Sequence, residues 1–322
     1  MPRVVVYSLM GRETAAPEGE PVVKTRPYSV LLAALGVIGA QAAATAQAVP
    51  AETHLDVPYA QVDGVDPGLL SLDIYVPHDA EDRPVVVYVH GGGWQRGDKA
   101  RVSALAPACL DEGYVFVSTN YRLAPEAPFP AWPEDVAAAI AWTHLNIAEY
   151  GGDPGRLWIM GHSAGAHLVA LVATDERYLE EHGLTLGDLA AVVPLDTQGL
   201  DLTALAADGG GELPRAYRVP FTDDPDVWTE ASPATYVEEG KGIPPTLLCY
   251  SGGSIPGRVN PGRQAFNEAY AEALRAAGVR AEVVGAPDRT HGQIVREFAA
   301  AEDPVAPAVF TFIADVLAAA RH

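Results

Sequence analysis

The sequence predicts an α/β fold with a mostly parallel central sheet that is covered by helices on both faces. From about residue 54, short apolar and β-branched runs alternate with longer stretches of helical periodicity. Glycine and proline stand at most of the joints, where they favour turns. No internal repeat and no Ser- or Gly-rich linker divides this part of the chain. We therefore expect one domain over residues 49–322.

The individual elements follow from the same alternation. The β-branched runs predict strands at residues 69–76, 84–90, 115–120, 157–160, 189–195, 246–250 and 280–284. The apolar periodicity predicts helices at residues 99–112, 133–150, 164–174, 261–277 and 304–320.

One segment, residues 201–242, breaks the alternation. It is rich in glycine, proline and acidic residues, and it scatters four aromatic residues, Tyr217, Phe221, Trp228 and Tyr236. Long excursions of this kind are often functional, so a lid or pocket wall is one interpretation. An ordinary surface excursion is an equally good one.

The first 48 residues have the layout of a secretory signal peptide. Lys24 and Arg26 precede an apolar run over residues 28–40, and an Ala-rich stretch ends at Ala48. The run is short for a membrane span, which needs roughly 20 apolar residues. No cysteine precedes Cys109, so no lipid-attachment cysteine follows the segment. We expect a mature chain that begins near Val49, is free of the membrane, and is secreted or periplasmic.

The charge balance excludes one class of partner. Lys plus Arg number 21 against 42 for Asp plus Glu, which gives a formal net charge of -21. Such a chain repels phosphate backbones and anionic membranes, so nucleic acid is not an expected partner. The two cysteines, Cys109 and Cys249, are too few for a disulfide scaffold, and we expect them to be buried free thiols.

The strongest chemical signal is the pentapeptide Gly161-His162-Ser163-Ala164-Gly165. It lies between a predicted strand and a predicted helix. A G-x-S-x-G sequence in this context is typical of a sharp strand-to-helix turn that presents a serine hydroxyl above the sheet. Ser163 is therefore the candidate nucleophile. The flanking His162, and His167 further along, are interpreted as pocket wall or packing.

A second glycine-rich motif, His90-Gly91-Gly92-Gly93-Trp94, closes an earlier strand. Its glycines would let main-chain amides approach a bound carbonyl, so Gly91 and Gly92 with Ala164 form the candidate oxyanion hole. A phosphate loop is disfavoured, because no Lys-Ser/Thr pair follows the glycines. His90 and Trp94 are expected to support the loop.

The block Tyr121-Arg122-Leu123-Ala124-Pro125-Glu126 and the following residues 129–135 link a strand to the next helix. We expect a structural role there, with Glu134 and Asp135 in the first helical turn facing the positive helix end.

Taken together, HGGGW, YRLAPE, FPAWPED, GHSAG and the THG at residues 290–292 resemble the hormone-sensitive-lipase-like and kynurenine-formamidase-like branch of α/β hydrolases, over residues 54–320. His162 before the serine favours the part of that branch with carboxylesterases, feruloyl and acetylxylan esterases and arylformamidases. The resemblance implies an α/β-hydrolase fold and serine hydrolysis.

In this fold the catalytic histidine follows the last core strand, where His291 stands; beyond His182 the sequence has one other histidine, His322 at its end. The acid usually follows the strand at residues 246–250, but residues 251–263 contain no Asp or Glu. Asp196, at the end of the preceding strand, is the best substitute, although it could equally be a helix cap or loop residue. Asp201 and Asp288 are the next candidates.

Three hypotheses follow. The first is a carboxylesterase for small-molecule esters or ester-decorated polymers, and the second an amidase or arylformamidase with the same residues. The third is a binding module on a hydrolase fold, suggested by the missing acid. No metal cluster, dinucleotide fingerprint or cofactor motif occurs, so no metal or cofactor is expected.

Overall fold

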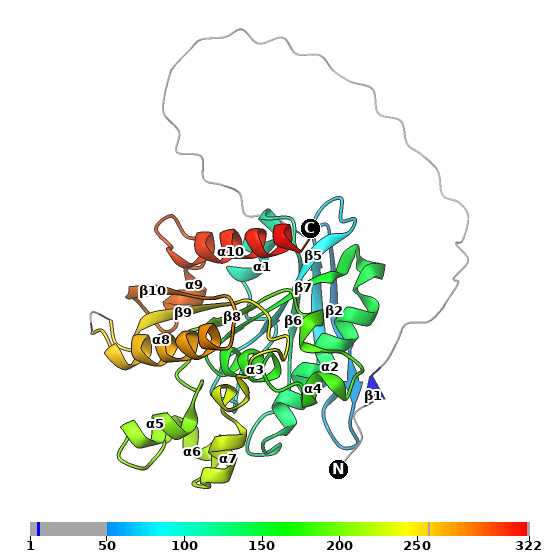
Figure 1. Ribbon diagram of the computed structural model, residues 1–322. Coiled ribbons are helices and arrows are strands. Elements are labelled where there is room, and N and C mark those ends of the chain that lie inside the picture. Colours follow the sequence, from blue (N-terminus) through cyan, green and yellow to red (C-terminus); the bar gives the residue numbers. More distant parts are fainter. Residues whose placement is uncertain (1–4, 7–49, 257, 321–322) are drawn as a thin grey trace, which may run out of the picture.

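A computed structural model describes residues 5–6, 50–256 and 258–320 (Figure 1). The proposed signal segment lies outside these residues, except for strand β1 (Val5–Val6), which pairs antiparallel with β3 (Ala60–Gln61). Within the described residues, no helix has both the length and the apolar character that crossing a bilayer requires.

The centre of the protein is an eight-stranded sheet in the order β10-β9-β8-β7-β5-β6-β4-β2. Its six strands from β10 to β6 run parallel, and β4 and β2 continue the sheet antiparallel at one edge. This confirms the predicted α/β fold. The strands are β2 (Glu52–Pro58), β4 (Ser71–Val76), β5 (Arg83–Val89), β6 (Val115–Thr119), β7 (Gly152–His162), β8 (Val192–Leu195), β9 (Thr246–Gly253) and β10 (Ala281–Thr290).

Helices cover both faces of the sheet and create two apolar cores. Helices α1 (Leu105–Asp111) and α10 (Val305–Ala319) pack on one face, and α2 (Ala131–Asn146), α3 (Ala164–Val172) and α8 (Pro261–Ala276) on the other (Figure 1). The valine run of β5 suits a central strand, because Val85, Val86 and Val87 point to alternate faces of the sheet and are all fully buried. The shorter helices are η1 (Pro67–Leu70), η2 (Ile147–Tyr150), α4 (Arg177–Glu180), η3 (Leu186–Asp188) and α9 (Gln293–Arg296).

The segment at residues 201–242 lies between β8 and β9 and folds into helices of its own. It contains α5 (Leu202–Asp208), α6 (Arg215–Phe221), α7 (Pro225–Glu230) and η4 (Pro233–Tyr236). Rings of Tyr217 and Phe221 on α6 lie 5.2 and 4.7 Å from that of Trp94. Helices α5 and α8 line a cavity of about 330 Å³.

The predicted helix at residues 99–112 was wrong in its first six residues, because tertiary contacts occupy them. Lys99 Nζ lies 2.6 Å from a carboxylate oxygen of both Asp56 and Asp73, and the Lys99 carbonyl accepts a hydrogen bond from Ser118. Helix α1 therefore begins only at Leu105. Strand β2, which supplies Asp56, was not predicted, because most of its residues are exposed and carry little apolar alternation.

Other boundaries shifted by short 3-10 turns or by longer strands. Turn η1 delays β4 to Ser71, and η2 takes the end of the helix predicted to reach residue 150. Strand β8 begins only at Val192, three residues after the predicted start. Strands β7 and β10 are longer than predicted.

Both cysteines are buried free thiols, as expected. They lie on α1 and β9, and burial raises the pKa of each thiol far above its ordinary value.

Asp135 does more than face a helix end. Its buried carboxylate binds the Arg122 guanidinium, with Nη2 2.7 Å from Oδ1, and accepts the Arg122 main-chain N–H. Burial raises the pKa of Asp135 to about 6 in spite of the opposing guanidinium. The block around residue 122 is thus fixed to the start of α2 by a buried ion pair, which supports the predicted structural role.

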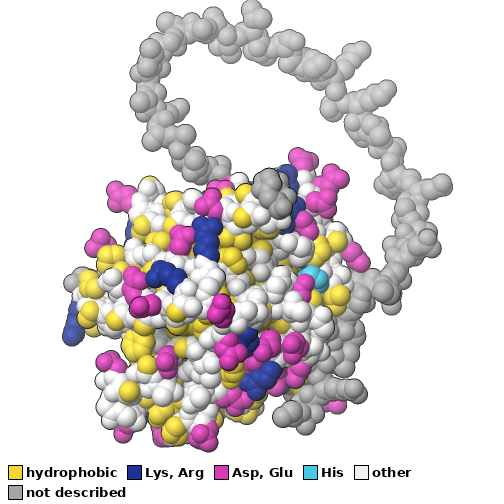
Figure 2. Space-filling model, viewed as in Figure 1, with side chains coloured by type: hydrophobic (Ala, Val, Ile, Leu, Met, Phe, Trp, Pro, Cys, Tyr) yellow, Lys and Arg dark blue, Asp and Glu magenta, His cyan; other side chains and the backbone are white. Residues whose placement is uncertain are grey.

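The surface carries the acidic excess of the sequence. In Figure 2, Asp and Glu side chains spread over the visible face, and Lys and Arg are fewer.

Candidate active site

Three of the predicted site residues each follow directly on a parallel strand. Ser163 comes one residue after β7, Asp196 one residue after β8, and His291 one residue after β10. Because parallel strands place their carboxyl ends at one edge of the sheet, the topology brings the three side chains together.

Ser163 occupies a strained turn between β7 and α3. Its backbone angles are φ 58° and ψ -114°, a conformation that costs on the order of 1–3 kcal/mol for a residue with a side chain. The turn is tight enough that a Cβ on Gly161 would lie 2.3 Å from the Gly165 carbonyl oxygen, and one on Gly165 would lie 2.1 Å from the Val89 carbonyl oxygen. The flanking glycines are therefore needed for the serine to project from the sheet.

The imidazole of His291 reaches the serine. Its Nε2 lies 2.9 Å from Ser163 Oγ. The main-chain N–H of His291 donates to the Gly253 carbonyl at 2.7 Å, which ties the loop after β10 to the end of β9.

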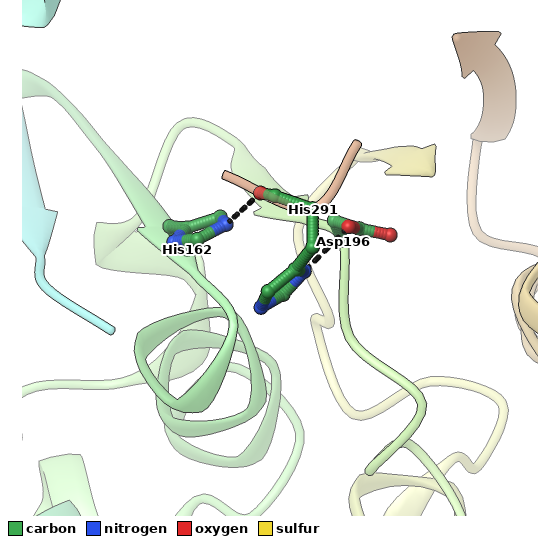
Figure 3. A group of neighbouring side chains, drawn as sticks. All are labelled: His162, Asp196 and His291. Atoms are coloured by element: carbon green, nitrogen blue, oxygen red, sulfur yellow. Dashed lines mark hydrogen bonds and ion pairs between the residues drawn. The ribbon is translucent and has the colours of Figure 1, made fainter. Parts of the chain in front are cut away.

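Asp196 completes the series on the other side of the imidazole. Its Oδ2 lies 2.6 Å from His291 Nδ1, and Figure 3 shows this contact between the ends of β8 and β10. The carboxylate is fully buried, and its backbone has a positive φ of 60°. With Nδ1–H donating to this carboxylate, Nε2 is left as the acceptor that faces the serine hydroxyl.

Four donors converge on Asp196. Besides His291, the carboxylate accepts hydrogen bonds from the Ser251 main-chain N–H at 2.9 Å and from the Ser251 hydroxyl, and Arg263 Nη1 lies 2.7 Å from Oδ1. Burial opposes ionisation, but the His291 hydrogen bond and the Arg263 charge outweigh it and hold the pKa of Asp196 below its ordinary value. The group is a carboxylate at neutral pH.

Two of the candidate oxyanion residues, Gly91 and Ala164, flank the serine. A Cβ on Gly91 would lie 2.9 Å from the Ser163 Cβ, so the main chain of this glycine passes directly beside the nucleophile. Gly92 has a φ of 138°, and a Cβ there would overlap the Arg96 carbonyl. Ala164 is the first residue of α3, where an amide has no acceptor within its own helix.

His90 and Trp94 support that glycine loop, as expected. The His90 ring stacks on Tyr121 with centroids 4.5 Å apart, and its Nδ1 lies 2.9 Å from the Gly91 carbonyl oxygen. Burial lowers the pKa of His90 to about 4. Trp94 packs into the aromatic group of α6 and against His167 at 5.3 Å.

The other two histidines near the serine have packing roles. His162 Nε2 lies 2.9 Å from the His291 carbonyl oxygen and holds the loop that carries the base (Figure 3). His167 Nε2 lies 2.7 Å from the Ala231 carbonyl oxygen, which ties α3 to the end of α7. Burial lowers the pKa of each to about 4, so both imidazoles are neutral at pH 7.

The alternative acids lie elsewhere. Asp201 caps α5, accepting the Ala204 N–H at 2.8 Å, and Asp288 is exposed on β10. Sequence reasoning missed Ser251 and Arg263. The signal for Ser251 was its place after residues 246–250, where the resemblance leads one to expect the acid.

Donor atoms of His162, Asp196 and His291 lie within 4.8 Å of one another, which is close enough to hold a metal ion. The Asp196 and His291 atoms, however, already make the hydrogen bonds described above. The donor set therefore fits a proton-transfer series better than a metal site.

Known proteins resemble this chain in sequence and fold. The BD-FAE family profile matches residues 72–252. Carboxylesterase NlhH of Mycobacterium tuberculosis (strain CDC 1551 / Oshkosh) is 34% identical over 235 residues, which is 69% of this chain and 70% of that protein.

Two solved structures extend the comparison. A hyperthermophilic esterase from the archaeon Pyrobaculum calidifontis is 28% identical with a TM-score of 0.61, covering 77% of this chain and 81% of its own. A truncated carbohydrate esterase from gut microbiota, at 22% identity and a TM-score of 0.67, covers 84% of this chain and 98% of its own, and shares the fold. By its profile match and its relatives, this chain belongs to the BD-FAE family of α/β hydrolases.

Proposed function

We propose that the protein is a carboxylesterase that works through an acyl-enzyme on Ser163. The observation that carries the proposal is the continuous series from Ser163 Oγ through His291, at 2.9 Å, to Asp196, at 2.6 Å. The relative at 34% identity is named a carboxylesterase, which supports the same reaction class.

The geometry assigns each residue a step. As the Ser163 oxygen attacks the ester carbonyl carbon, His291 Nε2 accepts the serine proton, and the resulting imidazolium is stabilised by Asp196. His291 then gives this proton to the departing alkoxide oxygen as the C–O bond breaks, leaving the acyl group on Ser163. A water molecule activated by His291 attacks the acyl carbon, and the serine leaves with its proton restored.

The negative oxygen formed in both attacks needs donors. The amides of Gly91 or Gly92 and of Ala164 are the proposed donors, because both main-chain segments lie beside Ser163. Removing one such donor in a serine hydrolase typically costs about 3–4 kcal/mol of transition-state stabilisation.

Asp196 also removes the reason for proposing an inactive binding module. That hypothesis depended on the acid missing after β9, and the buried Asp196 carboxylate, 2.6 Å from His291 Nδ1, supports an active series instead.

Covalent labelling tests the proposal. A fluorophosphonate should label the purified protein with one equivalent, and Ser163→Ala should abolish both labelling and hydrolysis of p-nitrophenyl acetate. Ser103→Ala, at an exposed serine, is the matched control and should leave both unchanged. A folded Ser163→Ala protein that still hydrolyses the ester at the wild-type rate would refute the assignment.

For the substrate, we propose carboxylic esters, either as small molecules or carried on a polymer. The relative's name supports the ester class. A panel of p-nitrophenyl esters of increasing acyl length, an acetylated polysaccharide and an N-formyl aromatic amine separates these substrates from the amide alternative. Faster turnover of the formyl amine than of every ester would favour the arylformamidase hypothesis.

We further propose that the chain is exported. The basic residues Lys24 and Arg26, the apolar run after them and the Ala-rich end at Ala48 support this. N-terminal sequencing of protein collected from outside the cytoplasm should give a start near Val49. Recovery of the uncleaved chain from the cytoplasm alone would contradict it.

A further inference from the structure

We propose that Arg263 is a positioning residue that extends the working pH range of the esterase towards acid, by sharing the Asp196 carboxylate with His291. This inference rests on the proposed function of the Ser163, His291 and Asp196 series. It adds a fourth member to that series, a cation that acts on the base through the acid.

Arg263 reaches the site from the first turn of α8. Its Nη1 lies 2.7 Å from Asp196 Oδ1 and 3.2 Å from His291 Nδ1. The side chains of Arg263 and Asp196 are 11% and 0% exposed, so water screens this contact weakly. The guanidinium is therefore held against both the acid and the base.

The two carboxylate oxygens of Asp196 bind different partners. Oδ2 faces His291 Nδ1 and the Ser251 hydroxyl, whereas Oδ1 faces Arg263 and the Ser251 main-chain N–H. The carboxylate stands between two groups that can both be cationic, and it is the closer neighbour of Nδ1, at 2.6 Å against 3.2 Å. Nδ1 thus keeps its proton for Asp196, and Arg263 acts by its charge.

That charge opposes protonation of the base. A carboxylate alone would favour the imidazolium form of His291, in which Nε2 can no longer accept the serine proton. With Arg263 in place, protonating His291 sets two cations side by side on one carboxylate. Arg263 is therefore placed to offset part of the attraction that Asp196 exerts on a second proton at the imidazole.

Other titratable side chains lie near His291. His162, at the end of β7, has ring centroids 4.6 Å from His291, and burial lowers its pKa to about 4, so it is neutral over most of the working range. On α9, Arg296 lies against Gly292, the next residue after His291, but it is exposed. The end of β9 contributes the uncharged Ser251. Arg263 is thus a buried cation in direct contact, and Arg296 offers a solvated one for comparison.

The pH profile of kcat/KM separates this role from a structural one, because its acid limb reports ionisation of the free enzyme. Wild type, Arg263→Gln, Arg263→Lys and Arg296→Gln would be assayed with p-nitrophenyl acetate from pH 4 to 9 at constant ionic strength. In Arg263→Gln we expect the acid limb to move up by about one pH unit, a roughly tenfold loss on that limb.

The controls have defined outcomes. Arg263→Lys keeps the charge and should stay within about 0.3 pH unit of wild type, and Arg296→Gln should match wild type. If Arg263→Gln does not fold, Arg263→Met replaces it, since it keeps the aliphatic bulk. The inference would be overturned if the acid limb of Arg263→Gln stayed at the wild-type position, or if it moved equally in Arg263→Lys. Even in that case, ester hydrolysis by wild type and its loss in Ser163→Ala would show that the proposed function holds.

Discussion

The Asp196→Asn substitution probes the acid directly, because it removes the charge while keeping the shape of the side chain. Four donors converge on the carboxylate, from Ser251 main chain and hydroxyl, Arg263 and His291. An amide offers one acceptor oxygen, and its NH₂ group faces donors. Nδ1 of His291 would then accept from the amide, and the ring proton would move to Nε2, where it blocks the base.

The magnitude follows from this change of tautomer. In other serine hydrolases the same substitution lowers kcat about 10⁴-fold, equivalent to about 5 kcal/mol of barrier. The buried Arg263 also loses its partner, for which we expect a stability loss of about 3 kcal/mol.

Two measurements check the prediction: kcat with p-nitrophenyl acetate, and urea unfolding. Asp201→Asn is the matched control, since Asp201 caps α5 and Asn caps helices equally well. It should keep both values. A folded Asp196→Asn protein with kcat within tenfold of wild type would refute the assignment of the acid.

Three further predictions concern stability. The pKa of His167 falls to about 4 on folding, so below pH 6.5 the unfolded chain binds a proton that the native one does not. Between pH 7 and pH 5, the free energy of unfolding of wild type should therefore fall by about 2 kcal/mol more than that of His167→Gln, as measured by urea titrations. Equal falls in the two proteins would contradict this. Gly165→Ala should cost about 3 kcal/mol or more, because its Cβ would lie 2.1 Å from a carbonyl oxygen, whereas Gly187→Ala meets only ordinary contacts and should be near neutral in thermal melts. Lys99→Met should cost about 3 kcal/mol, since it leaves the buried Asp73 carboxylate without its cation, and a loss below 1 kcal/mol in urea unfolding would show that the pair is dispensable.

The sequence predicted the parts of the site that short motifs encode. Ser163 and the glycines around it were found because a strained turn restricts the residues that can occupy it, and the restriction is local in sequence. Ser251 and Arg263 were not found, because their roles depend on a carboxylate that lies 55 or more residues away along the chain. A serine after a strand and an arginine in a first helical turn carry no distinguishing pattern.

The fold likewise could be predicted where the pattern is local in sequence, and not where it depends on distant contacts. Central strands such as β5 are buried on both faces and read as continuous apolar runs. The edge strand β2 is held by pairing with β4 and by the ion pair between Asp56 and Lys99, and neither leaves an apolar pattern. The helix predicted at residues 99–104 was wrong for a related reason, because the tertiary contacts of Lys99 override the local helical periodicity.

The position of the acid shows what the sheet itself constrains. Strands β8 and β9 are parallel neighbours, with Leu195 beside Cys249, and adjacent strands lie about 4.8 Å apart. A carboxylate after either strand can therefore reach the same imidazole. The residue after the other strand must then supply hydrogen-bond donors to that carboxylate. Here Ser251 occupies that position and donates twice to Asp196, so the loop without an acid still builds the acid's surroundings. Because Asp196 is then fully buried, a cation such as Arg263 can bind its second oxygen without displacing His291.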